Sequence, residues 1–322
     1  MNFRELIEKI KGKDIKTNIN KFDEENGFAS IKNFCFKYKY ILLAVFIGII
    51  LISIVSIVVK NQTSKSLAIE EIQQQEEDIM RIALENKQKE EEEKKIKEEL
   101  EKQREKEEEE NATGIIYLTF DDGPTADSTP QILDILEQNN IKATFFVIHY
   151  SEQNEHLVKR EKEQGHTIAL HGYSHTYSVV YQSADSCLEN FRKIGEQVYQ
   201  TTGINSKIIR FPGGTSNTVS RKYCEGVMTE LSQRAIDEGY RIFDWNVDSD
   251  DAGRAKTSDD IYNNVTSKLK PGRNNVVLMH DFAGNHKTIG ALQGIINFGK
   301  ENGYVFRKIT EETEMVMHHV NN

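Results

Sequence analysis

The chain has 322 residues and a mass of 37.0 kDa, which allows one or two domains. Its 51 Asp and Glu outnumber its 41 Lys and Arg, and the net charge of −10 argues against a nucleic-acid-binding protein, whose binding surface is basic. Three cysteines are too few for a scaffold built on disulfides. These averages conceal a chain whose composition changes sharply along its length.

The first two segments predict a membrane anchor. Residues 1–39 carry a small excess of Lys and Arg, and residues 40–59 contain no charged side chain. About 20 apolar residues cross a bilayer as a helix, and this run is longer than the apolar region of a cleaved signal peptide. The basic residues before it favour an N-terminus on the inside. We therefore expect a cytoplasmic tail, a single transmembrane helix over 40–59 and an extracytoplasmic remainder at the cell membrane.

The third segment, residues 60–113, predicts a charged spacer that follows this anchor. Residues 70–110 consist almost entirely of Glu, Lys, Gln and Arg, and neither Pro nor Gly interrupts them. A solvated helix and a disordered tether both fit this composition. A coiled coil is the alternative, because Ile72 and Ile79 are seven residues apart, but the apolar positions are too sparse for sustained heptads. Weak self-association through the spacer would accompany that alternative.

Residues 114–322 have an ordinary composition and are long enough for one large core. Short β-branched runs alternate with amphipathic stretches, which is typical of an α/β fold with a parallel sheet. The expected strands are 115–120, 143–148, 167–170, 207–210, 240–245, 275–279 and 304–309, and clear helices are 130–138, 184–202, 258–269 and 287–302. The length is short for an eight-unit barrel of about 250 residues but suits seven units.

Polar clusters follow five of these strands. The chain reads Thr-Phe-Asp-Asp-Gly-Pro from 119, His-Gly-Tyr-Ser-His from 171, Arg-Phe-Pro-Gly-Gly from 210, Asp-Trp-Asn-Val-Asp from 244 and Leu-Met-His-Asp from 278. One Asp at a strand end is more often a turn or capping residue. In α/β barrels, however, the carboxyl ends of the strands carry the active site, and clusters after five strands predict such a site here.

The residue types in these clusters indicate a metal-dependent hydrolase. His171 and His175 are four residues apart and would share one face if the segment turned helically. Two imidazoles and one carboxylate are a common ligand set for catalytic Zn²⁺. The same set serves non-haem iron oxygenases, and only a fold-level analogy favours the hydrolase.

Two adjacent carboxylates would divide the remaining chemistry. Neighbouring side chains on an extended strand point in opposite directions. One of Asp121 and Asp122 would therefore bind the metal, while the other would act as a general base on water. His280 is the candidate general acid for the leaving group, and Arg210 can pair with a carboxylate and orient it.

The five strings, in this order, resemble the polysaccharide deacetylase family, also called the NodB-homology domain or carbohydrate esterase family four. The resemblance covers about residues 114–309. It implies a distorted (β/α) barrel of seven or eight units that hydrolyses the N-acetyl group of GlcNAc-containing polymers. The catalytic domain would then occupy residues 114–322.

The resemblance also assigns roles to residues, motif by motif. Asp121 resembles the catalytic base, Arg210 the arginine that orients it and His280 the general acid. The remaining assignments are Asp122, His171 and His175 as metal ligands, Asp251 as the support of His280, Leu278 as the acetyl-pocket wall and the Gly213 N–H as an oxyanion donor. Independently of the resemblance, we expect Trp245 to be part of the core or of the groove wall. Two positions depart from the family pattern, since Ala252 stands where Trp is usual and Gly213 where some members have a larger residue.

The leading hypothesis is a membrane-anchored peptidoglycan N-acetylglucosamine deacetylase that uses a divalent ion, with Zn²⁺ first among the first-row metals. Its product would be less susceptible to lysozyme-like hydrolases. A second hypothesis changes the sugar to N-acetylmuramic acid or to an exported poly-GlcNAc or chitin-like glycan. A third, of another class, is an inactive tether that binds the wall, and the intact set of acidic and histidine side chains argues against it.

Overall fold

The computed structural model describes residues 43–52 and 65–322, with side chains from residue 74 onward in the second range. The predicted cytoplasmic tail lies outside the described residues. So does the predicted transmembrane segment 40–59, except for residues 43–52, which are helical. Within the described ranges, no helix combines the length and the apolar character needed to cross a membrane. The chain divides into two compact units, Met1–Lys97 and Glu98–Asn322.

Helix α4 (Lys65–Asn111) accounts for most of the predicted spacer. Its described side chains are largely exposed, as the composition predicts for a solvated helix. The end of α4 belongs to the second unit, where Arg307 holds it. The guanidinium Nε lies 3.0 Å from Glu109 Oε1, and Nη2 lies 3.0 Å from Glu108 Oε2. The helix therefore leads directly into the sheet domain.

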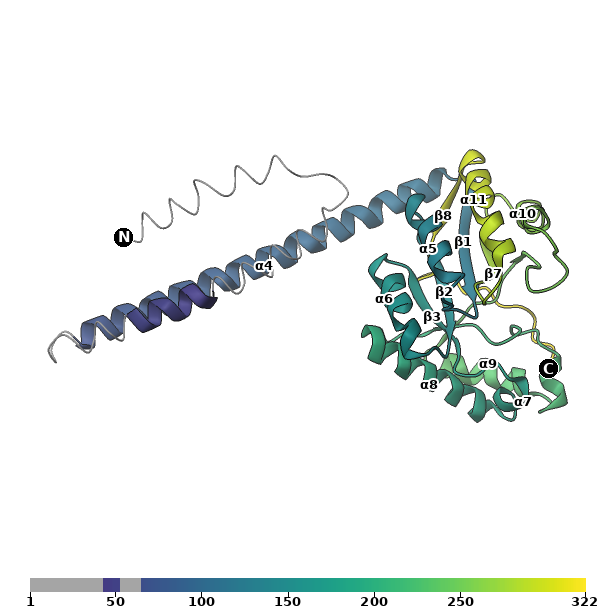
Figure 1. The fold of residues 1–322 in the computed structure, drawn as a ribbon, viewed down its shortest axis with the longest axis horizontal. Coiled ribbons are helices and arrows are strands. Elements are labelled where there is room, and N and C mark those ends of the chain that lie inside the picture. The colour runs from purple at the N-terminus through teal and green to yellow at the C-terminus, as the bar shows by residue number, and fades with distance from the viewer. Residues whose placement is uncertain (1–42, 53–64) are drawn as a thin grey trace. The chain divides into compact units, whose positions relative to one another are not determined.

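The second unit is built on a parallel sheet. Its strands are β1 (Gly114–Asp121), β2 (Thr144–Ile148), β3 (Thr167–Gly172), β4 (Ile208–Ile209), β5 (Arg241–Ile242), β6 (Val247–Asp248), β7 (Asn274–His280) and β8 (Tyr304–Arg307). Their order is β5-β4-β3-β2-β1-β7-β6, and β8 pairs with the first half of β1. All seven expected strands are present. The sheet is curled rather than fully closed, because in the described residues no ladder joins β5 to β6. Figure 1 shows β2, β1 and β7 of this sheet side by side.

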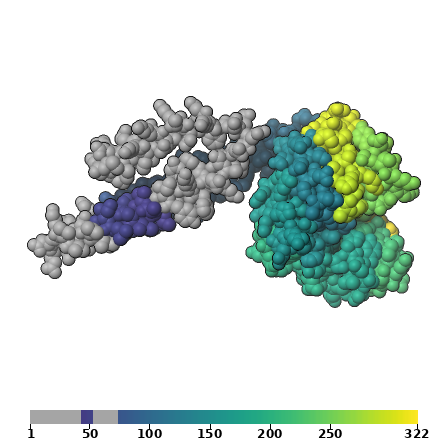
Figure 2. Space-filling model, in the orientation of Figure 1, coloured from purple at the N-terminus to yellow at the C-terminus, as the bar shows by residue number. Residues whose placement is uncertain are grey.

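Helices cover the outside of this sheet. They are α5 (Thr129–Gln138), α6 (Glu155–Glu163), α7 (Tyr177–Val180), α8 (Ala184–Thr202), α9 (Val227–Asp237), α10 (Ser258–Thr266) and α11 (His286–Glu301), with short 3-10 turns at η3 (Glu152–Asn154) and η4 (Val219–Lys222). Two of them begin at a side-chain cap, since Ser183 accepts a hydrogen bond from Ser186 N and Thr257 accepts one from Asp260 N. The space-filling view shows the helix-covered face as a closed surface (Figure 2).

The core has two parts, one on each face of the sheet. Alternate residues of β1 point outward and pack beneath the helices, among them Ile116 and Phe120. The residues between them point inward, and a smaller inner cluster fills the curl of the sheet. Its members are Tyr117, Phe146, Ala169, Ile208, Phe243, Val276 and Ile309. Cys187 and Cys224 are free thiols.

Candidate active site

A layer of polar side chains follows the inner apolar cluster toward the carboxyl ends of the strands. On β1, Thr119 and Asp121 succeed Tyr117 on the same face because side chains alternate with a period of two. The same step leads from Ala169 to His171, from Ile208 to Arg210 and from Val276 to Leu278 and His280. The strands are parallel, so these residues meet at one edge of the sheet.

Arg210 is the centre of this layer. Its side chain is fully buried, and Nη1 donates to Asp121 Oδ1 at 2.7 Å and to Thr119 Oγ1 at 2.8 Å. The other guanidinium nitrogens donate to the backbone oxygens of Phe243 and Asp244 at 2.8 and 2.9 Å. Burial raises the pKa of Asp121 above its ordinary value, although the Arg210 charge opposes this. Asp121 is therefore a rigidly held carboxylate with increased basicity.

Asp122 does not continue the strand. Its φ of 73° is left-handed, and this conformation overturns the expectation that its side chain points away from that of Asp121. Asp122 Oδ1 and Asp121 Oδ2 both lie 3.7 Å from His171 Nε2. Asp122 Oδ1 also lies 3.7 Å from His175 Nε2. The two carboxylates thus converge on the same imidazole.

A turn brings His171 and His175 together. The segment between them is not helical, so the helical arrangement that would put both side chains on one face does not occur. Strand β3 ends at Gly172, whose φ is +137°, and the two imidazole centroids are 5.1 Å apart. Asn190 of α8 fixes the turn, because its side chain accepts from Ser174 N at 2.7 Å and donates to Ser174 O at 2.9 Å. The sequence analysis did not find Asn190, which lies in an unremarkable stretch of amphipathic helix.

The side chains of Asp122, His171 and His175 fit a divalent metal ion. One ligand atom from each lies within 4.8 Å of the others. His171 Nδ1 donates to Arg210 O at 2.8 Å, which leaves the Nε2 lone pair free, and burial lowers the pKa of His171 to about 3. Asp122 Oδ1 is buried without a hydrogen-bond partner. A neutral imidazole and an unpaired carboxylate oxygen facing each other are what a cation site requires.

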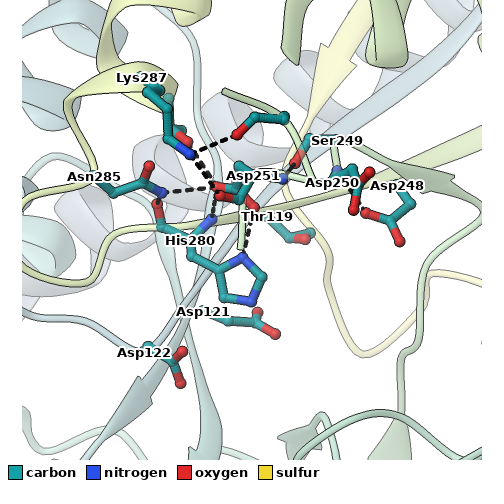
Figure 3. Close-up of polar contacts among 12 residues, drawn as sticks. Thr119, Asp121, Asp122, Asp248, Ser249, Asp250, Asp251, His280, Asn285 and Lys287 are labelled. Carbon is teal, nitrogen blue, oxygen red and sulfur yellow. Dashed lines mark hydrogen bonds and ion pairs between the residues drawn. The ribbon is translucent and has the colours of Figure 1, made fainter. Parts of the chain in front are cut away.

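His280 lies on the other side of Asp121 and is held by Asp251 (Figure 3). The ring Nδ1 lies 2.7 Å from Asp251 Oδ1, and His280 N donates to Asp251 Oδ2 at 2.8 Å. Two residues that the sequence did not single out, Asn285 and Thr288, also donate to Asp251 Oδ2, at 2.9 and 2.6 Å. Burial lowers the pKa of His280, but the hydrogen bond and charge of Asp251, together with the charges of Asp121 and Asp122, outweigh it and raise the pKa to about 9.

The expected substrate contacts occupy three different positions. Leu278 is 6% exposed and stands two residues before His280 on the same face of β7. Gly213 is exposed with a φ of +78°, and a Cβ there would lie 2.4 Å from the Tyr177 hydroxyl, so a larger residue cannot fit unless Tyr177 moves. Trp245 is half-buried against the inner cluster and lies beside Arg210. Of the two readings for Trp245, core packing is therefore favoured.

Asp281 is a further residue at this edge that the sequence analysis left without a role. It is fully buried, and its Oδ2 accepts from Thr129 Oγ1 at 2.6 Å while its backbone oxygen accepts from Thr125 Oγ1 at 2.7 Å. A Cβ on Gly123 would lie 2.1 Å from Asp281 Oδ1, so only glycine fits there. Asp281 thus ties the end of β7 to the loop that follows Asp122.

The chain is similar in sequence to known proteins. The sequence pattern of the polysaccharide deacetylase family matches residues 108–227. The peptidoglycan-N-acetylglucosamine deacetylase PgdA of Listeria monocytogenes is 36% identical over 203 residues, which are 61% of this chain and 38% of that protein. A Bacillus cereus peptidoglycan-N-acetylglucosamine deacetylase is 34% identical over 205 residues, which are 62% of this chain and 89% of that protein.

A solved structure shows the same fold. The catalytic domain of a peptidoglycan N-acetylglucosamine deacetylase from Eubacterium rectale is 39% identical, with a TM-score of 0.62 over 65% of this chain and 94% of that one. The chain spans less than half of the Listeria protein but most of the Bacillus protein and of the Eubacterium domain. The chain therefore belongs to the polysaccharide deacetylase family, whose members hydrolyse N-acetyl amide bonds.

Proposed function

We propose that this chain removes N-acetyl groups from the GlcNAc residues of peptidoglycan and that it depends on a divalent metal ion. The observation that carries the proposal is the convergence of the Asp122–His171–His175 cluster, the buried Asp121–Arg210 pair and the Asp251–His280 pair at one edge of the sheet. A ligand set, a base and an acid are the groups that amide hydrolysis needs.

Asp122, His171 and His175 would hold the metal. When bound, Zn²⁺ or another first-row divalent ion would supply Lewis-acid polarisation of the acetyl carbonyl and acidify a water molecule. The protein keeps His171 neutral by burial and fixes its tautomer through Arg210 O, so that its Nε2 is available as a ligand.

Asp121 would act as the general base. Arg210 occupies its Oδ1, so Oδ2, which faces His171, is the oxygen that can take a proton from water. The Gly213 N–H would donate to the oxyanion that develops on the acetyl group. His280, whose ring is turned by Asp251, would protonate the departing amine. Leu278, beside His280 on the same strand face, would contact the acetyl methyl group.

The proposed substrate rests on the relatives. The Listeria, Bacillus and Eubacterium proteins are each named for peptidoglycan N-acetylglucosamine. N-acetylmuramic acid and an exported poly-GlcNAc or chitin-like glycan carry the same acetyl group and are the alternative substrates. An inactive wall-binding tether would have no need for the hydrogen-bonded acid and base described above.

We further propose that residues 40–59 anchor the chain in the cell membrane with the catalytic domain outside, and that α4 spaces this domain from the membrane. The uncharged run at 40–59 and the uninterrupted charge of α4 support this arrangement. An enzyme in this place would act on the wall of its own cell, and the resulting free amines would weaken attack by lysozyme-like hydrolases.

The test is to incubate the full chain with purified peptidoglycan and to locate new free amines by mass spectrometry of the released muropeptides. Amines on GlcNAc, with one acetate released for each, are the expected result. Amines on N-acetylmuramic acid alone would replace the proposed substrate by the alternative. Intact acetyl groups on peptidoglycan and, in a parallel incubation, on a poly-GlcNAc oligomer, both with Zn²⁺ added, would contradict deacetylation altogether.

A further inference from the structure

Residues 315–322 return to the open edge of the sheet beside β5. Arg241 N donates to Lys207 O and Phe243 N donates to Ile209 O of β4, so the alternate amides, those of Ile242 and Asp244, face the other side. On that side, Ile242 N contacts Met315 Sδ at 3.4 Å and Asp244 N donates to Val316 O at 2.6 Å. The segment therefore occupies the edge of β5 that a closed barrel would give to β6.

From this edge the segment reaches the loop that carries Gly213. Asp244 is fully buried, and its carboxylate accepts from His318 N at 2.7 Å and from Thr215 N at 3.0 Å. The Thr215 hydroxyl is also bonded to this carboxylate. Asp244 thus joins the segment to a residue two positions after Gly213.

The His318 side chain makes a second link. Its Nε2 lies 2.6 Å from Trp245 O and must carry the hydrogen, because a carbonyl oxygen only accepts. Its Nδ1 lies 3.1 Å from Ser216 Oγ, and the ring packs edge-on against Trp245 at 4.7 Å between centroids. One imidazole therefore bridges the end of β5 and the loop. His318 is half-buried, and both of its ring nitrogens have a hydrogen-bond partner.

This loop needs such support. Gly213 and Gly214 both have left-handed φ angles, +78° and +76°, and two successive glycines restrict their own backbone little. On the near side the loop is held at Pro212, whose oxygen accepts from the Tyr181 hydroxyl at 2.7 Å. On the far side it is held at Thr215 and Ser216, through Asp244 and His318.

We infer that His318 is a positioning residue for the reaction, which holds the loop from Gly213 to Ser216, and with it the Gly213 N–H, in place from the open edge of the sheet. The inference rests on the proposed function, since it gives Gly213 the role of oxyanion donor. Its effect should fall on turnover and not on metal binding, because Asp122, His171 and His175 are carried by other strand ends.

The experiment compares three variants of the full chain on a GlcNAc oligomer. We expect His318→Ala to lower kcat by roughly 10- to 100-fold and to leave bound metal and KM unchanged. This decrease in kcat does not exceed the one expected when an oxyanion donor is removed altogether. His318→Gln, whose amide nitrogen can still donate to Trp245 O, should recover most of kcat. His319→Ala, at the exposed neighbouring histidine, is the matched control and should behave as wild type.

Hydrogen exchange of the backbone amides of residues 211–217 provides a readout that does not need activity. His318→Ala should speed exchange there and His319→Ala should not. If the wild-type chain deacetylates neither peptidoglycan nor a poly-GlcNAc oligomer, the proposed function is refuted. Hydrogen exchange of residues 211–217 would still decide whether His318 holds the loop. A kcat of His318→Ala within twofold of His319→Ala, or unchanged exchange, would overturn the inference. If His318→Ala fails to fold, Ser216→Ala replaces it in both measurements, because it removes only the partner of His318 Nδ1. The same changes in kcat and in exchange are then required.

Discussion

His280 and Asp251 are the clearest case of one side chain setting the proton affinity of another at this site. Burial raises the pKa of Asp251, but the hydrogen bond and charge of His280, helped by the Thr288 hydroxyl, bring it down to about 2. The same pair raises the pKa of His280 to about 9. His280 is therefore protonated at neutral pH, as a group that must donate a proton requires.

Replacement of Asp251 by Asn tests this coupling. In the wild type, kcat/KM should fall as the pH rises through about 9, because His280 loses its proton there. Asp251→Asn removes the charge that raises the pKa of His280 while burial still lowers it, so the fall should begin at a pH roughly two units lower. The measurement is kcat/KM across pH 5–11. Asp259→Asn, on the exposed first turn of α10, removes the same charge elsewhere and should leave the profile unchanged.

At the scale of elements, the geometry of the metal cluster depends on the turn that follows strand β3 and on its contact with helix α8. His171 is the last residue but one of β3 and His175 lies in the turn beyond it, while Asn190 of α8 hydrogen-bonds Ser174 between them. Gly172 allows the close approach, since a Cβ there would lie 2.3 Å from Asn190 Nδ2. The helix thereby fixes a turn that has no regular structure of its own.

Asn190→Ala should therefore affect both stability and metal binding. The loss of two hydrogen bonds, at about 0.5–1.5 kcal/mol each, predicts a free energy of unfolding lower by about 1–3 kcal/mol. A looser His175 should weaken metal affinity by roughly 10- to 100-fold, the usual effect of losing a residue that supports a ligand. Denaturant melts and metal titration measure the two effects. Lys193→Ala, exposed on the same helix, is the control, and equal metal affinities for the two variants would refute this role of Asn190.

The elements also show what the sequence could predict. The grouping of Asp121, His171, Arg210 and His280 could be predicted from the sequence, because period-two alternation and parallel pairing put these strand ends at one edge of the sheet. The contacts of Asn190 and His318 could not be predicted, since their partners are 16 residues away for Asn190 and 73 to 102 residues away for His318, and no local pattern marks them. The conformation between His171 and His175 was left open, because their spacing puts them on one face only if the segment is helical, and the structure has a turn with Gly172 at a φ of +137°.

At the scale of the whole molecule, the described part of the chain combines a solvated helix with a sheet domain to which its last turns are fastened. Arg307 of β8 bonds the Glu108 and Glu109 side chains and the Glu105 carbonyl. In the proposed arrangement, residues 40–59 span the membrane and α4 connects the bilayer to the catalytic domain. The charge of α4 keeps it in solvent, which suits a spacer.

Protease treatment of intact cells tests this arrangement. If the catalytic domain is outside, trypsin, which cleaves after the many Lys and Arg of α4, should release it without lysis. A tag before residue 40 should stay protected until the membrane is opened. A domain that is protected in intact cells and digested after lysis would place it inside and would remove peptidoglycan from its reach.

The division of labour between Asp121 and Asp122 is the central claim, and one paired measurement tests it most directly. Bound metal per chain and turnover on a GlcNAc oligomer are determined for Asp121→Asn and Asp122→Asn. Asp122→Asn should lose both, because an amide is a poor substitute for a carboxylate ligand. Asp121→Asn should keep its metal and lose roughly 10²–10⁴-fold in kcat, as expected for a missing general base. A metal-free Asp121→Asn beside a metal-loaded Asp122→Asn would contradict the account.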